Sequence, residues 1–352
     1  MLPTTTSFER PRLLALDLLR FSAAIVVALG HFSGSGATRI APGFWMAVPL
    51  FFVLSGYVLA HAYEREIGVG KLNFRSFVIY RLARLYPLHI LAFAAMCALW
   101  GFLYILHPAA NFRLVGSWGQ LFETLTLTHF WLGYTQSFNL PSWSISVEFW
   151  GGILVFWLCL IAPNKLVVIL CATALYAFSG LLPFTLTLND KAYYAGFAAF
   201  AWGWAIYAYK AAISTIFSRV PSVVRLGMAV TLILVIAASP MDPAKFPLME
   251  AAIYLFIVVT VAGLSSLAPV ESRILRWAGD ISYGVYMWHW PLFMALPFIV
   301  SPFARAFQIP IMGTWVADFF FLTLLLVVST VSFQKFERPT QAAIRRLSLR
   351  SR

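Results

Sequence analysis

Ten apolar runs, each long enough to cross a lipid bilayer as a helix, recur along this chain. The hydrocarbon core of a bilayer is about 30 Å thick, and a helix needs about 20 apolar residues to cross it. The runs lie at approximately 13–31, 44–62, 88–106, 143–162, 166–183, 192–212, 222–239, 248–268, 281–300 and 311–333. They are continuous, whereas the strands of a membrane β-barrel would show short alternation. The sequence therefore predicts an all-α integral membrane protein with about ten transmembrane helices.

The composition excludes the soluble and disordered classes of protein. The chain is 61% hydrophobic and 11% charged, whereas a soluble domain is roughly 25% charged. The formal charge of +12 does not indicate nucleic-acid binding, because the basic residues are scattered through the short gaps between apolar runs. Membrane topology and anionic lipid headgroups account for that distribution. Membrane lipid is therefore an expected partner, and nucleic acid is not.

The distribution of basic residues also predicts the orientation. If the N-terminus is cytoplasmic, most of the Lys and Arg residues fall in cytoplasmic gaps and in the tail, as the positive-inside rule requires. Both termini are then cytoplasmic. The first run is interpreted as an uncleaved helix, because it is long and contains Arg20 where a signal peptide would be apolar. We expect a polytopic membrane domain over residues 1–340 and a basic cytoplasmic tail over 341–352.

Ionisable residues within the apolar runs are candidates for function, because their burial in a membrane is costly. The first run contains Arg20 and His31, which are eleven residues apart, about 16 Å along a helix, and lie on one face. Asp17 lies one turn before Arg20 and could pair with it. The alternatives to a catalytic role are a structural Asp17–Arg20 pair and a histidine that ends the helix among the lipid headgroups.

Glu148 is placed one to two turns into the run 143–162, on the same predicted side of the membrane as His31. A carboxylate there could orient an imidazole or raise its basicity. The alternative is a charge satisfied by nearby serine and tryptophan donors. Those polar neighbours are Ser142, Trp143, Ser144 and Ser146, and serines in such a position also commonly bond their own helix backbone.

Two further runs carry residues suited to a pocket wall. The run 281–300 contains Tyr283, Tyr286 and His289, followed by a proline that frees a backbone carbonyl. The run 44–62 contains Ser55 and Gly56, which would allow a helix or a ligand to approach closely. Ordinary helix packing is the alternative for both.

The segment 75–87, which precedes the third run, combines apolar residues with arginines. It is typical of an amphipathic helix lying in the membrane interface. Arg81 and Arg84 are one turn apart and could bind phosphate groups bidentately, although contact with lipid headgroups is the alternative. The three cysteines lie in apolar runs without metal-ligand spacing, so no metal site is expected. Four histidines receive no role: His61, His89, His107 and His129.

Six motifs, taken in order, resemble those of the membrane acyltransferase-3 family. They are Arg20-x10-His31, Phe51-Phe52-Val53-Leu54-Ser55-Gly56-Tyr57, Arg81-Leu82-Ala83-Arg84-Leu85-Tyr86-Pro87, Trp143-Ser144-Ile145-Ser146-Val147-Glu148, Ser282 to Pro291, and Phe336-Glu337-Arg338-Pro339. The resemblance covers about residues 13–339. Gly284 departs from many members, which carry a bulkier residue or proline there. With no esterase-like domain in these 352 residues, the chain resembles the stand-alone members.

The resemblance implies that an acyl group passes from cytoplasmic acyl-coenzyme A to a hydroxyl of a surface or secreted glycan, in the bacterial cytoplasmic membrane. Acetyl-coenzyme A is the default donor, and no metal is implied. His31 would act as general base or carry the acyl group, with Glu148 setting its tautomer and Arg20 stabilising the oxyanion. The residues expected to bind coenzyme A are Arg81, Arg84 and Tyr86. The residues expected in the substrate pocket are Ser55, Gly56, Trp143, Ser144, Ser146, Tyr283, Tyr286 and His289.

Two other functions remain open at this level. A transporter or flippase for an anionic or glycolipid substrate could use Arg20, Glu148 and His289 as binding or proton-relay groups. A structural membrane scaffold would need none of them. The sequence does not select the acceptor among lipopolysaccharide, exopolysaccharide, oligosaccharide signals, peptidoglycan and antibiotics, and it does not indicate the oligomeric state.

Overall fold

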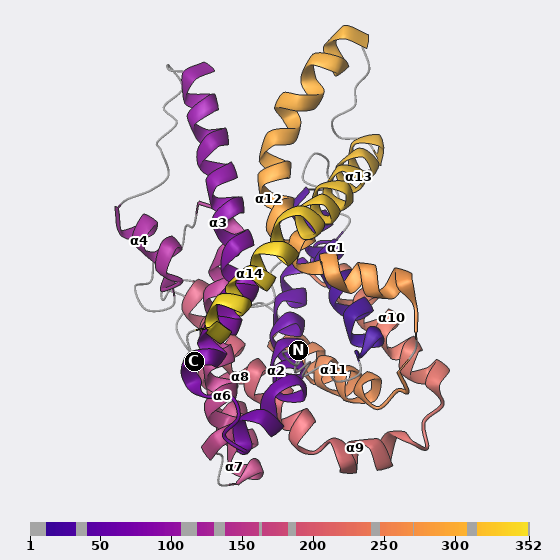
Figure 1. Cartoon of the computed structure of the whole chain (residues 1–352). Coiled ribbons are helices and arrows are strands. Elements are labelled where there is room, and N and C mark those ends of the chain that lie inside the picture. Colours follow the sequence, from indigo (N-terminus) through magenta and orange to yellow (C-terminus); the bar gives the residue numbers. More distant parts are fainter. Residues whose placement is uncertain are drawn as a thin grey trace.

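The computed structural model describes residues 12–32, 41–106, 118–129, 138–161, 164–181, 188–240, 247–269, 271–307 and 315–350. Within these residues all regular secondary structure is helical (Figure 1), as the sequence predicts. The longer helices are α1 (Leu14–Phe32), α2 (Ala47–Gly68), α3 (Phe74–Leu106), α6 (Trp143–Ile161), α7 (Lys165–Leu181), α8 (Leu188–Ala208), α10 (Ser222–Ala238), α11 (Pro247–Ser265), α12 (Arg273–Phe307), α13 (Trp315–Ser332) and α14 (Arg338–Arg350). The shorter ones are η1 (Phe44–Met46), α4 (Trp118–Thr126), η2 (Leu140–Ser142), α9 (Lys210–Phe217) and η4 (Phe333–Glu337).

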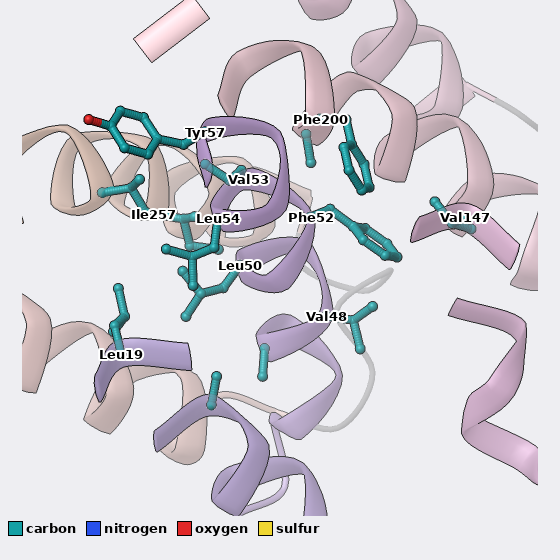
Figure 2. Close-up of a cluster of buried hydrophobic side chains, with 14 of the residues drawn as sticks. Leu19, Val48, Leu50, Phe52, Val53, Leu54, Tyr57, Val147, Phe200 and Ile257 are labelled. Carbon is teal, nitrogen blue, oxygen red and sulfur yellow. The ribbon is translucent and has the colours of Figure 1, made fainter. Parts of the chain in front are cut away.

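Helix α2 lies at the centre of the molecule and packs against α1, α6, α8 and α11. Its two sides bury different residues, as Figure 2 shows. Leu50 and Leu54 face Leu19 of α1, while Phe52 faces Phe200 of α8. Because α2 is packed on several sides by other helices, its side chains have fixed positions relative to those helices.

Glycines allow α2 and α8 to approach closely. A β-carbon on Gly56 would collide with the backbone carbonyl oxygen of Phe200, and one on Gly203 would collide with that of Val53. Two backbones in direct contact leave no room for side chains between them. Gly56, expected in the substrate pocket, is therefore a helix-packing residue.

Six helices in the described part of the chain are long and apolar enough to cross a membrane, or seven if the pair α9 and α10, bent by 107°, counts as one span. The predicted count of ten is not confirmed, although each predicted run overlaps a helix. The runs 166–183, 192–212 and 281–300, which lie in α7, α8 and α12, are not among these helices. The described apolar part of α7 ends at Ser179 and is short, and α12 carries the polar and aromatic side chains of residues 282–290, which lower its mean hydropathy.

Two segments expected to be separate are continuous with membrane-spanning helices. The segment 75–87, predicted as an interfacial helix, forms the first part of α3, and Pro87 is accommodated within that helix. The predicted tail, up to residue 350, belongs to α14, which follows α13 through a turn of π-helix (η4). In Figure 1, α13 and α14 form one long rod that reaches α3, and α14 packs on α3.

Candidate active site

A cavity of about 480 Å³ lies between α1, α2, α3, α6, α12 and α14. Among the residues that the structure describes, five arginines and two carboxylates, Glu148 and Asp280, line it, so the cavity has the charge to bind an anion. Among the residues expected at the site, eight line the cavity: Arg20, Ser55, Arg81, Arg84, Ser144, Glu148, Tyr283 and Tyr286. The fold thus brings together residues from five of the six sequence motifs.

Glu148 and Arg81 form a largely buried ion pair at the cavity. The Arg81 Nη2 atom lies 3.4 Å from Glu148 Oε1 and donates to the Glu148 backbone carbonyl at 3.0 Å. Ser55 Oγ lies 3.5 Å from the same carboxylate oxygen. Because Gly152 has no side chain, α6 leaves room for the guanidinium; a β-carbon there would stand 2.7 Å from Arg81 Nε. The recorded partners of Glu148 are thus Arg81 and Ser55, and its expected role in orienting His31 stays a prediction.

A second group of charges lies where α1 meets α12. Arg20 pairs with Asp17 at 3.6 Å, as the spacing of the two residues predicts. Asp17 also accepts from Arg12 Nε at 2.6 Å, and Arg12 donates to Asp280 of α12 at 2.8 Å. Gly279 of α12 allows Asp17 to pack directly against that helix, because a β-carbon on Gly279 would stand 2.6 Å from the Asp17 side chain. Arg12 and Arg20 therefore face the cavity with their charges already matched by carboxylates.

The third charged group connects α3 with η4, the segment that follows α13. Arg84 pairs with Glu337 at 3.8 Å, and its guanidinium carbon lies 5.3 Å from the centre of the Tyr283 ring. The Tyr283 hydroxyl donates to the Leu85 carbonyl at 2.7 Å. A β-carbon on Gly284 would stand 3.2 Å from Ser329 and 3.4 Å from Glu337. Glycine at this position allows α12 and α13 to pack closely beside the cavity.

The cavity reaches Ser144 and Tyr286, which lie close to the two histidines. The hydroxyl groups of Ser144 and Tyr286 are 2.8 Å apart. His289 follows Tyr286 by one turn, is fully buried, and its Nδ1 is 2.6 Å from the Tyr286 carbonyl oxygen. Its ring lies against that of His31, with centroids 5.0 Å apart. Neither histidine lines the cavity itself. His31 packs on His289, and His289 in turn packs on the cavity residue Tyr286.

Four other expected site residues lie away from the cavity. Trp143 packs against Phe52 and Tyr193. Ser146 is buried and donates to the Leu127 carbonyl, and the Tyr86 hydroxyl donates to the Leu125 carbonyl. Gly56 faces α8, as described above. None of the four is among the cavity-lining residues.

The structure also adds cavity residues that the sequence analysis missed. They are Arg12, Asp280, Gln341 and Arg345, together with the aromatic residues Phe51, Tyr63 and Tyr80. Gln341 and Arg345 belong to the predicted tail, where no signal marked them. Glu337 lies within the recognised motif 336–339, which was a signal for its place beside Arg84. In the described part of the chain, no three His, Cys, Asp or Glu side chains gather closely enough to hold a metal ion.

Comparison with known proteins identifies the family of this chain. The sequence profile described as "Acyltransferase domain" (Acyl_transf_3) matches residues 13–333. The chain belongs to the acyltransferase-3 family. This match includes Arg20, His31 and Glu148 but ends before Gln341 and Arg345. No solved structure matches the chain.

Three curated relatives of this family member share parts of its sequence. Peptidoglycan O-acetyltransferase OatA of Listeria monocytogenes is 25% identical over 332 residues, 82% of this chain and 50% of that protein. Protein 2 in the picA locus of Rhizobium radiobacter is 42% identical over 98 residues, 27% of this chain and 49% of that protein. Acyltransferase MdmB of Streptomyces mycarofaciens is 32% identical over 153 residues, 39% of this chain and 37% of that protein. The matches thus span half of each relative's length or less.

Proposed function

We propose that this protein is a membrane O-acyltransferase that transfers an acyl group, by default acetyl, from acyl-coenzyme A to a hydroxyl of an extracytoplasmic glycan. The observation that carries the proposal is the arginine-lined cavity, which extends to Tyr286, one turn of α12 from the His31–His289 pair. Coenzyme A carries phosphate groups at one end and the reactive thioester at the other. A cavity with arginines along it and a histidine pair near one end fits such a donor.

The hydrogen bond of His31 determines which ring nitrogen can act as a base. His31 Nδ1 lies 3.0 Å from the Val27 carbonyl oxygen. A carbonyl oxygen only accepts, so Nδ1 carries the proton in the neutral ring, and Nε2 carries the basic lone pair. This backbone contact within α1 gives His31 the tautomer that general-base or nucleophilic catalysis at Nε2 requires.

Two reaction routes are compatible with that tautomer. In direct transfer, Nε2 takes the proton of the acceptor hydroxyl while its oxygen attacks the thioester carbonyl carbon. The carbon–sulfur bond breaks, and the sulfur leaves with the electron pair and takes up the proton. In the alternative, Nε2 itself attacks the thioester carbonyl carbon, the carbon–sulfur bond breaks, and coenzyme A leaves as its thiolate. The hydroxyl oxygen then attacks the acyl-histidine, the carbon–nitrogen bond breaks, and the hydroxyl proton passes to the thiolate. Arg20 lines the cavity and is the candidate cation for the developing oxyanion.

We further propose that the protein lies in the cytoplasmic membrane of a bacterium and that the end of the cavity lined by Arg12 opens to the cytoplasm. Arg12 precedes α1, and His31 lies in its last turn; the 19 residues of this helix rise about 28 Å. That distance is close to the thickness of the hydrocarbon core. Donor and acceptor therefore enter from opposite sides. Peptidoglycan is the first acceptor to test, since OatA is named for it.

The test is release of free coenzyme A from acetyl-coenzyme A by proteoliposomes of the full chain, with peptidoglycan fragments or crude surface glycan as acceptor. Wild-type protein is compared with His31→Ala at equal amounts of folded protein. Acceptor-dependent release that the variant lacks supports acyl transfer. Binding of the donor without release with any acceptor, together with movement of a glycolipid or anion across the vesicle membrane, supports the transporter instead.

A further inference from the structure

Helix α14 contributes a basic side chain to the cavity from outside the part of the chain that the family profile matches. Gln341 and Arg345 both line the cavity. They are four residues apart and so lie on one face of the helix, which packs along α3. The guanidinium carbon of Arg345 lies 5.5 Å from the centre of the Tyr80 ring of α3. The C-terminal helix thus forms part of the cavity wall.

Arg345 differs from the other arginines of the cavity in its ionic partners. Arg12, Arg20, Arg81 and Arg84 each form an ion pair with a carboxylate. Across the described ranges, Arg345 forms no such pair, and its side chain is exposed. An anion that bound a paired arginine would have to share or displace a carboxylate. Binding at Arg345 carries no such cost.

Contact with Tyr80 suits Arg345 to binding phosphate. A guanidinium near a ring face gains only about 0.5–1 kcal/mol at an exposed site, so the contact does not compete with an ionic ligand. Its N–H groups lie at the edge of the guanidinium plane and remain available to phosphate oxygens in a bidentate arrangement. The aromatic contact therefore positions the side chain without neutralising its charge.

We infer that Arg345 is a phosphate-binding residue at the mouth of the cavity and that it holds a phosphate group of the donor. The inference rests on the proposed function, which supplies the donor, and it moves the phosphate contact from the paired arginines Arg81 and Arg84 to α14. A lipid headgroup offers the same chemistry from a different source, so the experiment separates the two.

The chain contains a matched control for this residue. Arg346 is the next residue on α14, is also exposed and does not line the cavity. Arg345→Ala and Arg346→Ala therefore remove the same charge from the same helix, but only one of them changes the cavity. Arg345→Lys keeps the charge and loses the bidentate geometry. Equal thermal unfolding midpoints of the variants in detergent show that all of them fold.

Two measurements test the inference, both on the full chain. The first is the affinity for 3′,5′-ADP, the nucleotide part of coenzyme A, in detergent without added lipid. The second is the KM for acetyl-coenzyme A in vesicles of phosphatidylcholine alone. For Arg345→Ala we expect about tenfold weaker binding of 3′,5′-ADP, and a KM raised about tenfold with kcat nearly unchanged. Arg345→Lys falls between, and Arg346→Ala matches wild type.

The outcomes separate this inference from the proposed function. If Arg345→Ala and Arg346→Ala bind 3′,5′-ADP equally well, the phosphate site is wrong, even when wild type transfers acyl groups. If Arg345→Ala weakens 3′,5′-ADP binding while no acceptor supports coenzyme A release, the phosphate site stands and acyl transfer fails. An effect of Arg345→Ala that appears only when phosphatidylglycerol is added to the vesicles assigns the residue to lipid and overturns the inference.

Discussion

The rings of His31 and His289 pack against each other with centroids 5.0 Å apart and planes inclined by 33°, although they belong to the first helix and to one near the end of the chain. Both rings direct Nδ1 at a backbone carbonyl oxygen, that of Val27 for His31 and that of Tyr286 for His289. In the neutral pair both protons are therefore on Nδ1, and both basic nitrogens are Nε2.

Replacing His31 tests its role as base or nucleophile. We expect His31→Ala to lower acceptor-dependent release of coenzyme A by about 10²–10⁴-fold, the usual contribution of a positioned base. His61→Ala is the control, because His61 stacks on Tyr57 and lies outside the cavity. Equal activity of the His31 and His61 variants would exclude His31 from the chemical step.

Breaking the Arg81–Glu148 pair should destabilise the protein. The side chains are 7% and 23% exposed, and removing one partner of a buried pair typically costs about 3–5 kcal/mol. We expect Arg81→Met to lower the thermal unfolding midpoint in detergent and the double variant Arg81→Met/Glu148→Gln to recover part of the loss.

The exposed pair Arg276–Glu271 provides the comparison for that experiment. Its side chains are 50% and 91% exposed, and surface pairs contribute about 0–1 kcal/mol. Arg276→Ala should therefore leave the midpoint nearly unchanged. A midpoint for Arg81→Met as high as that for Arg276→Ala would show that the buried pair does not stabilise the fold.

Gly56→Ala should act through stability. The added β-carbon meets the Phe200 carbonyl oxygen, so α2 and α8 must separate, at a cost of about 1–3 kcal/mol. Gly227→Ala is the matched control, because no atom lies within 4 Å of its β-carbon position in α10, and alanine in a helix is favoured by about 1 kcal/mol over glycine. A changed KM for the acceptor with unchanged stability would instead return Gly56 to the pocket.

The stability of the protein should decrease in mild acid because of His129. Burial, and secondarily the charge of His89, lowers the pKa of His129 from 6.5 to about 4. The unfolded chain therefore binds more protons between these values, and the stabilisation is complete above pH 6.5 and is lost as pH falls toward 4. The loss amounts to about 3 kcal/mol. His129→Phe should make the unfolding midpoint less dependent on pH in this range, and an unchanged dependence would assign the effect to other groups.

Tyr86→Phe tests whether Tyr86 binds coenzyme A, as predicted from the sequence, or only forms its hydrogen bond to the Leu125 carbonyl. The hydroxyl donates to the Leu125 carbonyl outside the cavity, so its removal should leave the KM for acetyl-coenzyme A within about twofold. A neutral hydrogen bond contributes about 1 kcal/mol to stability, and a small fall in the unfolding midpoint is expected. A KM raised tenfold or more would restore Tyr86 to the donor site.

Spacing along a single helix was predictable, since helical geometry alone determines it. The eleven residues between Arg20 and His31 placed them on one face about 16 Å apart, and Asp17 was expected to pair with Arg20, which the structure confirms. Contacts between helices were not predictable in this way. The contacts of Glu148 with Arg81 and Ser55 were not among the predictions, and its role in orienting His31 stays a prediction.

The amino-acid sequence was enough to predict a helical membrane protein of the acyltransferase-3 family, because runs of about 20 apolar residues and motifs in a fixed order are properties of the linear chain. The packing of the helices in three dimensions brought together the polar residues that share the cavity. It joined His31 to His289, turned Ser146 and Tyr86 toward backbone carbonyls, and placed Arg345 of the predicted tail in the cavity wall. Such contacts depend on which helices pack together. The periodicity of side chains in the sequence predicts which face of a helix is buried, but it does not predict which other helix packs against that face.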